Sequence, residues 1–401
     1  MKWKEIAIGE VCKVGRGSSP RPINDKAYFE GGQIPWIKIA DATKSGKIIF
    51  ETKEHVNSYG ASFSRLLPEG SLILATSGVS LGQVKFLGME GCIHDGWLYL
   101  DDFKNFDRGF MYYLLIGLTS YFHSQSYGAA IQNINTDILR ETKIPNPPIP
   151  TQQKIASILS TYDDLIENNL KRIRLLEEAA QHLYREWFVR FRFPGWEEVK
   201  VVDGLPEGWE RKAIGAVCET VGGGTPSTKE PKFWDSGEVI WFSPTDLSKN
   251  SSLVLLDSAS KITEEGLKSS SAKMLPPRTI LMSSRATIGL FGIISKPCST
   301  NQGFISIIPN EEYFRFYLLF NLLNRKQEII NNANGSTFKE ISKKHFREME
   351  IIMPTSDLTK QFHYLSESFL NQIENLECQN QKLKEARDIL LPRLMNQTLK
   401  V

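Results

Sequence analysis

The tetrapeptide Asn146-Pro147-Pro148-Ile149 is the segment of this chain that comes nearest to a catalytic motif. Amino-methyltransferases use Asn or Asp, two prolines and an aromatic residue to hold a base that has been rotated out of the DNA duplex. Ile149 stands where the aromatic ring would stack on that base, and the chain has no glycine-rich strand-to-helix fingerprint to hold a methyl donor. We therefore interpret the tetrapeptide as a proline-rich stop before a helix.

Other residue types that could support chemistry also lack the necessary spacing. Gly222-Gly223-Gly224-Thr225 has no Lys-Ser/Thr pair of a phosphate-binding loop, so we interpret it as a turn. The six histidines show no metal-ligand spacing and no Ser/His/Asp set can be argued. The five cysteines contain no Cys-x-x-Cys pair, which favours small core residues over disulfides or zinc. We expect no catalytic residue, no metal and no cofactor in this chain.

Length and composition predict a soluble, cytoplasmic protein. A chain of 401 residues with 41% hydrophobic and 23% charged residues is long enough for two to three globular domains. No apolar run approaches the length needed to span a membrane, and the N-terminus lacks the apolar stretch of a signal peptide. A net charge of +2 neither supports nor excludes nucleic acid as a partner, because a DNA-binding protein can concentrate its basic residues on one face.

A long helix is predicted from Thr151 to Phe191, with Thr151 as its N-cap. About 40 helical residues form a rod of roughly 60 Å, which is longer than an ordinary globular helix. Two rows of residues in heptads, one of them containing Asn169 as a register-fixing polar residue, predict a coiled coil rather than an amphipathic helix on a globular core. The expected contact residues are Tyr162, Ile166, Asn169, Ile173, Leu176, Leu183 and Trp187.

The partner for this helix is predicted in the same chain, from Asp357 to Asn396. The heptad pattern recurs there at an offset of 207 residues, and we expect Pro392 to kink or end the helix. The expected contact residues of the second helix are Phe369, Ile373, Leu376, Leu383 and Leu390.

The segments before the two helices are also copies of each other. The sequence from Trp3 to Cys12 matches that from Trp209 to Cys218, and matches continue in the same order through each half. Short alternating strands with one helical piece per half predict an α+β fold. We expect two β-rich globular domains, at 1–150 and 193–355, joined by two long helices, at 151–192 and 356–401, that pack as an antiparallel coiled coil. Such a pseudo-two-fold repeat suits a pseudo-palindromic ligand such as DNA.

This arrangement resembles the specificity subunit of a type I restriction-modification system over nearly the whole chain. The most specific matches are Ile155 to Leu159, Asp163 to Asn169, Arg185 to Gly195, Leu205 to Trp209 and Leu391 to Met395. The resemblance implies two target-recognition domains that each read half of a split DNA sequence. It also implies a helical spacer that docks two methyltransferase subunits and optionally two endonuclease subunits. S-adenosylmethionine, ATP and Mg would then bind only to those partners.

Candidate DNA contacts lie in two loops of each half. Small polar groups and amides suit base edges, Arg285 could bind a guanine through two hydrogen bonds, and lysines suit phosphates; solvated surface loops are the alternative. The candidates are Ser77, Ser80, Gln83, Gln132, Asn133, Asn135, Ser284, Arg285, Thr287, Lys339, Lys343 and Lys344.

Two other functions remain open at the level of the sequence. A DNA methyltransferase or nuclease with degenerate motifs would bind a methyl donor as an isolated chain. A stand-alone coiled-coil adaptor would give no sequence-specific footprint on DNA. The recognised bases and the spacer length cannot be read from the sequence.

Overall fold

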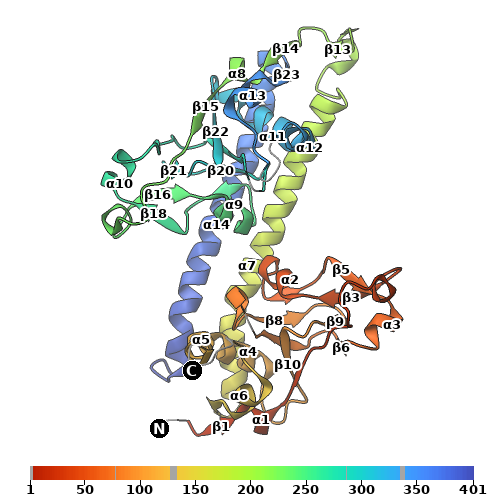
Figure 1. Cartoon of the computed structure of the whole chain (residues 1–401), viewed down its shortest axis with the longest axis vertical. Helices are drawn as coiled ribbons and strands as arrows, with labels where there is room; N and C mark the ends of the chain where they lie inside the picture. Colours follow the sequence, from red (N-terminus) through yellow and green to blue (C-terminus); the bar gives the residue numbers. More distant parts are fainter. Residues whose placement is uncertain (1–2, 77, 127–132, 286, 335–338) are drawn as a thin grey trace. The chain divides into compact units, whose positions relative to one another are not determined.

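The computed structural model describes residues 3–76, 78–126, 133–285, 287–334 and 339–401. The chain forms two compact units: unit 1 contains residues 1–168 and 380–401, and unit 2 contains residues 169–379. Each unit holds one β-rich domain, called here the first and the second domain. Each also holds a segment of both long helices, α7 (Ile149–Tyr184) and α14 (Ser356–Met395) (Figure 1).

A five-stranded sheet forms the centre of the first domain. Its strands lie in the order β2 (Lys13–Arg16), β10 (Trp97–Asp101), β7 (Leu72–Ala75), β8 (Val84–Leu87) and β4 (Ile48–Ile49). A four-stranded sheet has the order β5 (Glu54–Val56), β3 (Ile34–Ile37), β9 (Gly91–Ile93) and β6 (Arg65–Leu67). At the edge of the domain, β1 (Glu5–Ala7) pairs with β11 (Lys143–Pro145).

The central strand β7 is apolar at every position because both faces of its sheet are covered. Leu72 and Leu74 belong to a hydrophobic cluster shared with the helices, whereas Ile73 and Ala75 belong to a second cluster on the opposite face. Successive side chains of a strand point to opposite faces, so a strand between two cores reads as a continuous apolar run.

The second domain repeats this topology. Its five-stranded sheet has the order β15 (Cys218–Gly222), β22 (Phe304–Pro309), β19 (Ile280–Ser283), β20 (Phe291–Ile294) and β17 (Val254–Leu255). A smaller sheet has the order β18 (Ser260–Ile262), β16 (Val239–Phe242) and β21 (Ser299–Thr300), and β14 (Glu210–Ala213) pairs with β23 (Glu350–Met353). Equivalent strands occupy equivalent places in both five-stranded sheets, which confirms the predicted internal repeat.

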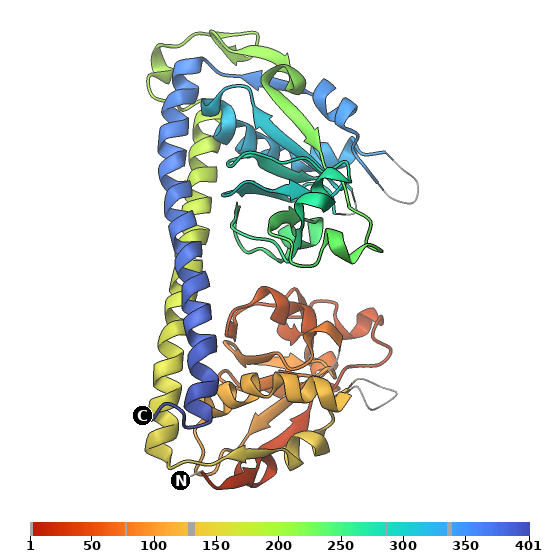
Figure 2. The same cartoon turned by 90° about the vertical axis from the view of Figure 1, so that its left-hand side faces the viewer.

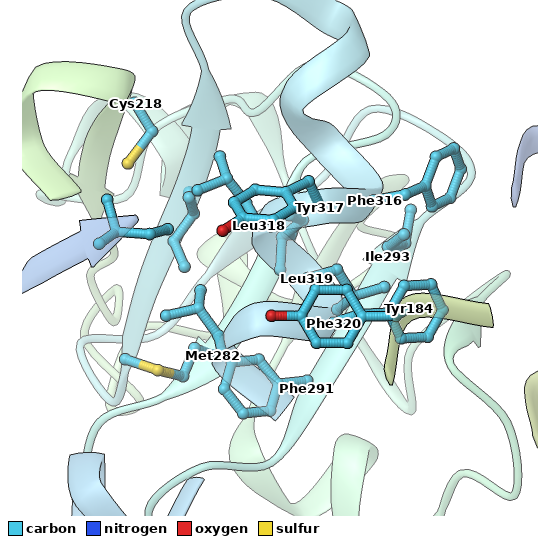
Figure 3. Packing of buried hydrophobic residues seen from close by; sticks show 14 of the residues in the cluster. Tyr184, Cys218, Met282, Phe291, Ile293, Phe316, Tyr317, Leu318, Leu319 and Phe320 are labelled. Atoms are coloured by element: carbon cyan, nitrogen blue, oxygen red, sulfur yellow. The ribbon is translucent and has the colours of Figure 1, made fainter. Parts of the chain in front are cut away.

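Helices cover one face of each five-stranded sheet. Each predicted helical piece is two helices: α4 (Arg108–Gly117) and α5 (Thr119–Ser126) in the first domain, α11 (Arg315–Asn324) and α12 (Lys326–Asn331) in the second. Figure 2 shows α4 and α5 running outward from the long helices across the first domain. In the second domain, residues Phe316 to Phe320 of α11 pack against Met282, Phe291 and Ile293 of the sheet and against Tyr184 of α7 (Figure 3).

Within each unit, α7 and α14 pack against each other and run in opposite directions. In unit 1, Ile155 and Leu159 of α7 share a hydrophobic cluster with Leu391 and Leu394 of α14. In unit 2, the corresponding cluster joins Ile173, Ala180 and Tyr184 of α7 to Phe362, Leu370, Ile373 and Leu376 of α14. Residue numbers rise along α7 as they fall along α14, so the predicted antiparallel packing is confirmed.

The ends of the long helices differ from the sequence prediction. α7 begins at Ile149 rather than at Thr151, because Pro150 lies in the first helical turn, where no backbone N–H is required. Its end is a π turn, η3 (Arg185–Val189), rather than a regular helix to Phe191. Pro392 lies inside α14, which ends three residues later at Met395. A proline so near the end leaves the helix little length to kink.

Candidate nucleic-acid interface

Two segments that are distant in the sequence meet at the end of β7 in the first domain. The Ile134 N–H donates a hydrogen bond of 3.0 Å to the Thr76 carbonyl oxygen, which joins the segment containing Asn133 and Asn135 to the loop after β7. The loop closes on itself, since the Gly82 N–H donates to the Ala75 carbonyl oxygen at 3.0 Å. Two candidate segments predicted from the sequence therefore lie side by side. Ser77 and Gln132 lie outside the described residues.

The second domain repeats this junction with the same backbone contact. The Ile341 N–H donates to the Ser284 carbonyl oxygen at 3.0 Å, and Arg285 pairs with Glu340 in an isolated antiparallel bridge. The loop between them and β20 is closed by a hydrogen bond of 3.0 Å from the Gly289 N–H to the Ser283 carbonyl oxygen. We refer to these two places as the loop junctions of the first and second domain.

Burial removes two of the predicted contact residues from the surface. Ser80 is 3% exposed and Ser284 is 2% exposed. Both were expected to contact bases, but side chains in the interior cannot reach a DNA groove. Short polar side chains beside a glycine turn fit either the surface or the core, so the sequence alone did not separate the two cases.

Of the three described amide side chains that are candidate DNA contacts in the first domain, one caps a helix and two are half-buried. The Asn135 side chain accepts a hydrogen bond of 2.8 Å from the Ile138 N–H, so it caps α6 (Thr136–Glu141). Gln83 and Asn133 are half-buried, and their amide oxygens have no hydrogen-bond partner among the described residues. Both oxygens are themselves buried, so neither is an exposed acceptor in this conformation.

Arg285 is held at the second loop junction by an ion pair. Its Nη2 lies 3.1 Å from Glu340 Oε1, and 41% of the Arg285 side chain is exposed. An ion pair between half-exposed side chains contributes less than about 1 kcal/mol, so the guanidinium can exchange this partner for another acceptor. Thr287 lies on the same loop and is exposed.

Basic side chains continue from the second loop junction onto α13 (Lys343–Glu348). Lys339, Lys343 and Lys344 are exposed. A groove of about 450 Å³ beside α13 is lined by three of its basic side chains and by residues of β14, of the short helix α8 (Ile214–Val217) and of β15. We call it the α13 groove; its lining residues are Ala213, Gly215, Thr220, Lys343, Lys344, Arg347 and Glu348.

The predicted coiled-coil residues all lie on buried or half-buried helix positions. Ile166, Asn169, Ile173, Trp187, Ile373 and Leu376 are buried, whereas Tyr162, Leu176, Leu183, Phe369, Leu383 and Leu390 are half-buried. Sequence reasoning missed a buried polar contact between the helices of unit 1. The Asp163 carboxylate accepts hydrogen bonds from Arg387 Nη1 at 2.6 Å and from Tyr113 Oη at 2.5 Å.

Both domains are attached to α7 by the same kind of hydrogen bond. Glu167 Oε1 accepts from the Lys47 N–H at 2.8 Å, and Glu177 Oε1 accepts from the Leu253 N–H at 2.5 Å. Lys47 and Leu253 are equivalent residues of the two domains. Burial, together with the nearby carboxylate of Glu377, raises the pKa of Glu177 to about 7.

The remaining motifs have structural roles. Asn146 accepts a weak hydrogen bond from Gln152 at the start of α7, in keeping with a helix boundary. A Cβ on Gly223 would lie 2.2 Å from two backbone oxygens, so this glycine permits a close approach of two chain segments. Burial raises the pKa of Cys12, Cys218 and Cys298 to about 12, which keeps these thiols neutral. Among the described residues, no group of three His, Cys, Asp or Glu side chains could hold a metal ion.

Comparison with known proteins identifies the class of this fold. The family model "Type I restriction modification DNA specificity domain" matches residues 1–178 and 206–385, once for each half of the chain. The chain therefore belongs to this family: it is a type I restriction-modification specificity subunit, the non-catalytic component that recognises the DNA target sequence. No helix of the described residues is long and apolar enough to cross a membrane.

Individual relatives match over nearly their whole length. The chain is 27% identical to the MjaIX specificity subunit of Methanocaldococcus jannaschii, over 100% of this chain and 94% of that protein. It is also 27% identical to the HindI specificity subunit of Haemophilus influenzae, over 98% of this chain and 99% of that protein. The crystal structure of the S subunit from M. genitalium has the same fold, with a TM-score of 0.56, 14% identity and coverage of 98% and 96% of the two chains.

Proposed function

We propose that each domain reads one half of a bipartite DNA target, and that the paired helices set the distance between the two halves. The observation that supports this proposal is the repetition of one loop junction in two domains of equal topology. Two copies of one reader suit two half-sites, because the arrangement of a DNA-binding protein is mirrored in its target. We assign target recognition to residues 1–150 and 193–355, and the spacer to residues 151–192 and 356–401.

The loop residues divide between base reading and backbone binding. Arg285 has the planar group that binds the O6 and N7 atoms of guanine, and Gln83 and Asn133 carry amide groups of the kind that pair with adenine edges. Thr287, and by sequence Ser77 and Gln132, belong to the same loops. Lysines supply charge rather than sequence information, so Lys339, Lys343 and Lys344 are assigned to phosphates.

The long helices dock the methyltransferase subunits in this proposal, with endonuclease subunits as optional further partners. Their support is the surface that α7 and α14 leave open: Leu165, Leu175, Tyr364 and Ile389 are large apolar side chains that are more than 45% exposed. Methyl transfer and DNA cleavage belong to those partners, and so do S-adenosylmethionine, ATP and Mg.

Methylome sequencing tests the proposal. The chain is expressed with its methyltransferase partner in a host that lacks other DNA methylation, and the modified motif is mapped. We expect two short specific half-sites separated by a non-specific spacer of fixed length. A single continuous motif, or methylation without sequence preference, would contradict the assignment of one half-site to each domain.

A further inference from the structure

The two loop junctions can be compared residue by residue, because their local packing is the same. Gly82 and Gly289 both have positive φ values, +81° and +77°, and a Cβ on them would meet Thr119 and Lys326 respectively. The helix that follows each junction is capped in the same way, α6 by Asn135 and α13 by Ser342. The strand registers relate residues of β7 and the start of its loop to those of the second domain by an offset of 208, and residues from Gly82 onward by an offset of 207, because the loop of the second domain is one residue shorter.

At these equivalent positions the two domains carry different charge. The second domain has six basic residues where the first has a single one. The pairs are Arg285 and Ser77, Lys326 and Thr119, Lys339 and Gln132, Lys343 and Thr136, Lys344 and Asp137, and Arg347 and Arg140. Acidic residues do not compensate for this difference. The second domain adds Glu340 and Glu348, whereas the first has Asp137 and Glu141. The second junction therefore carries a net positive charge and the first a small net negative one.

At the second loop junction, most of the basic side chains form no ion pair among the described residues. Among the described residues, Lys326, Lys339, Lys343 and Arg347 form no ion pair, and Lys344 reaches Glu348 only at 4.0 Å with its side chain 88% exposed. In the first domain the equivalent residue, Arg140, already has partners for its guanidinium group. Arg140 Nη2 donates to the Val14 carbonyl oxygen at 2.9 Å, and its Nη1 lies 3.4 Å from Asp137.

The α13 groove has the composition of a phosphate site. Lys343, Lys344 and Arg347 line it, and Glu348 is the one acidic residue among its lining residues. Thr220 also lines the groove, and its buried Oγ1 has no hydrogen-bond partner among the described residues. Ammonium and guanidinium groups together with a free hydroxyl are the donors that bind phosphate oxygens in protein–DNA interfaces.

We infer that the second domain is the electrostatic anchor of this protein on DNA, binding phosphates of the duplex backbone through Lys326, Lys339, Lys343 and Lys344 and through the α13 groove. The first domain, which lacks these charges, binds its half-site mainly through base edges and shape. This inference rests on the proposed function, since it assumes that both loop junctions face DNA. It follows that most of the loss of DNA affinity at high salt arises at the half-site that the second domain binds.

The inference predicts a measurable change in the response of binding to salt. Each phosphate contact by a cation contributes about 0.9 to the slope of log K against log salt concentration. Replacing four lysines by neutral residues therefore lowers the slope by up to about 3.6. Between 50 and 200 mM salt, the wild-type complex should lose about 150-fold more affinity than the variant complex does.

The experiment compares two quadruple variants of the full chain, each assembled with its methyltransferase partner, on the duplex mapped by methylome sequencing. The test variant gives the second domain neutral residues at the junction: Lys326→Thr, Lys339→Gln, Lys343→Thr and Lys344→Gln. The matched control removes four exposed lysines of the same domain that form no ion pair among the described residues: Lys229→Gln, Lys249→Gln, Lys268→Gln and Lys273→Gln.

We expect a reduced salt slope in the test variant, the wild-type slope in the control, and the same methylated motif in both. A test variant with the wild-type slope and wild-type motif would overturn the inference while leaving the proposed function intact. Wild-type protein without sequence preference would instead refute the proposed function. Should the quadruple variant fail to assemble, the pair Lys343→Gln and Lys344→Gln on the exposed face of α13 should lower the slope by about 1.8.

Truncated duplexes locate the effect without any substitution. A duplex cut within the spacer keeps one half-site and its flank. The half-site read by the second domain is identified as the one that changes in the Arg285→Ala variant. We expect the steep salt slope on that half-duplex and a shallow slope on the other. Equal slopes on the two half-duplexes would contradict an anchor confined to the second domain.

Discussion

The buried contact between Asp163, Arg387 and Tyr113 allows a direct test of how the long helices are held in unit 1. The Asp163 side chain is 5% exposed and that of Arg387 is 21% exposed. Removing one partner of a buried ion pair leaves an uncompensated charge and costs about 3 to 5 kcal/mol. Since Arg387 is partly solvated, we expect Arg387→Ala to lower the stability of unit 1 by about 3 kcal/mol.

Unit 2 supplies the variant that should restore the lost stability. The residues equivalent to Tyr113, Asp163 and Arg387 are Phe320, Leu370 and Ala180, which pack in one apolar cluster. The triple variant Tyr113→Phe, Asp163→Leu, Arg387→Ala gives unit 1 the apolar arrangement of unit 2. Replacing a buried ion pair by packed apolar residues is often neutral or stabilising. We therefore expect the triple variant to lie within about 1 kcal/mol of the wild type.

Hydrogen exchange measured by mass spectrometry reports on each unit separately. A loss of 3 kcal/mol corresponds to an increase of about 100-fold in the exchange rate of protected amides. This increase should appear in peptides from α4 in the Arg387→Ala variant and disappear in the triple variant. Peptides from α11 in unit 2 serve as the internal control. If the triple variant exchanged its amides as fast as the single variant, apolar packing could not replace the polar contact. That result would refute the expected equivalence of the two arrangements.

Three further predictions concern single residues. Glu177→Gln should stabilise unit 2 by about 1 to 3 kcal/mol above pH 7 and by little below pH 4.5. The raised pKa of Glu177 means that the folded state keeps a proton which the unfolded state has lost, so wild-type stability falls as pH rises through this range. Denaturant midpoints across pH measure the effect. The control is Glu178→Gln, which loses only an exposed ion pair with Arg174 and should change stability by less than about 0.5 kcal/mol. Gly223→Ala should cost about 2 kcal/mol or more, because its Cβ would meet backbone oxygens of Thr300 and Asn301. Gly117→Ala, where a Cβ meets nothing within 4 Å, should not destabilise, and equal thermal midpoints for the two variants would contradict this view. Arg285→Ala should alter one half of the methylated motif and leave the other unchanged, and equal loss at both halves would indicate a folding defect.

The heptads and the repeat were predictable because they follow from periodicity and from self-similarity within one chain. Leu176 and Leu383 recur with their neighbours at a fixed offset, and the offset alone identified the second helix as the partner of the first. The repeat also predicted that both domains share a topology, which the equal strand orders of the two five-stranded sheets confirm.

The loop junctions and the buried contact between the helices were not predictable from such patterns. The hydrogen bond from Ile134 to Thr76 joins two backbones, so it leaves no mark on side-chain types. The contact between Asp163 and Arg387 joins residues 224 positions apart. An aspartate between heptad rows looks the same in a sequence whether it faces water or a buried arginine. Comparison of the two repeats could have indicated this contact, because the equivalent positions in the other unit are apolar.

The paired helices are proposed to set the spacing between the two half-sites. The test inserts four helix-forming residues into each long helix where the chain passes between the units, between Asn168 and Asn169 and between Gln379 and Asn380. The helices lengthen by about 6 Å, and one base pair rises about 3.4 Å. Methylation mapping should then report the same two half-sites with a spacer longer by one or two base pairs. An active variant that methylates the original motif with its original spacer would contradict the claim.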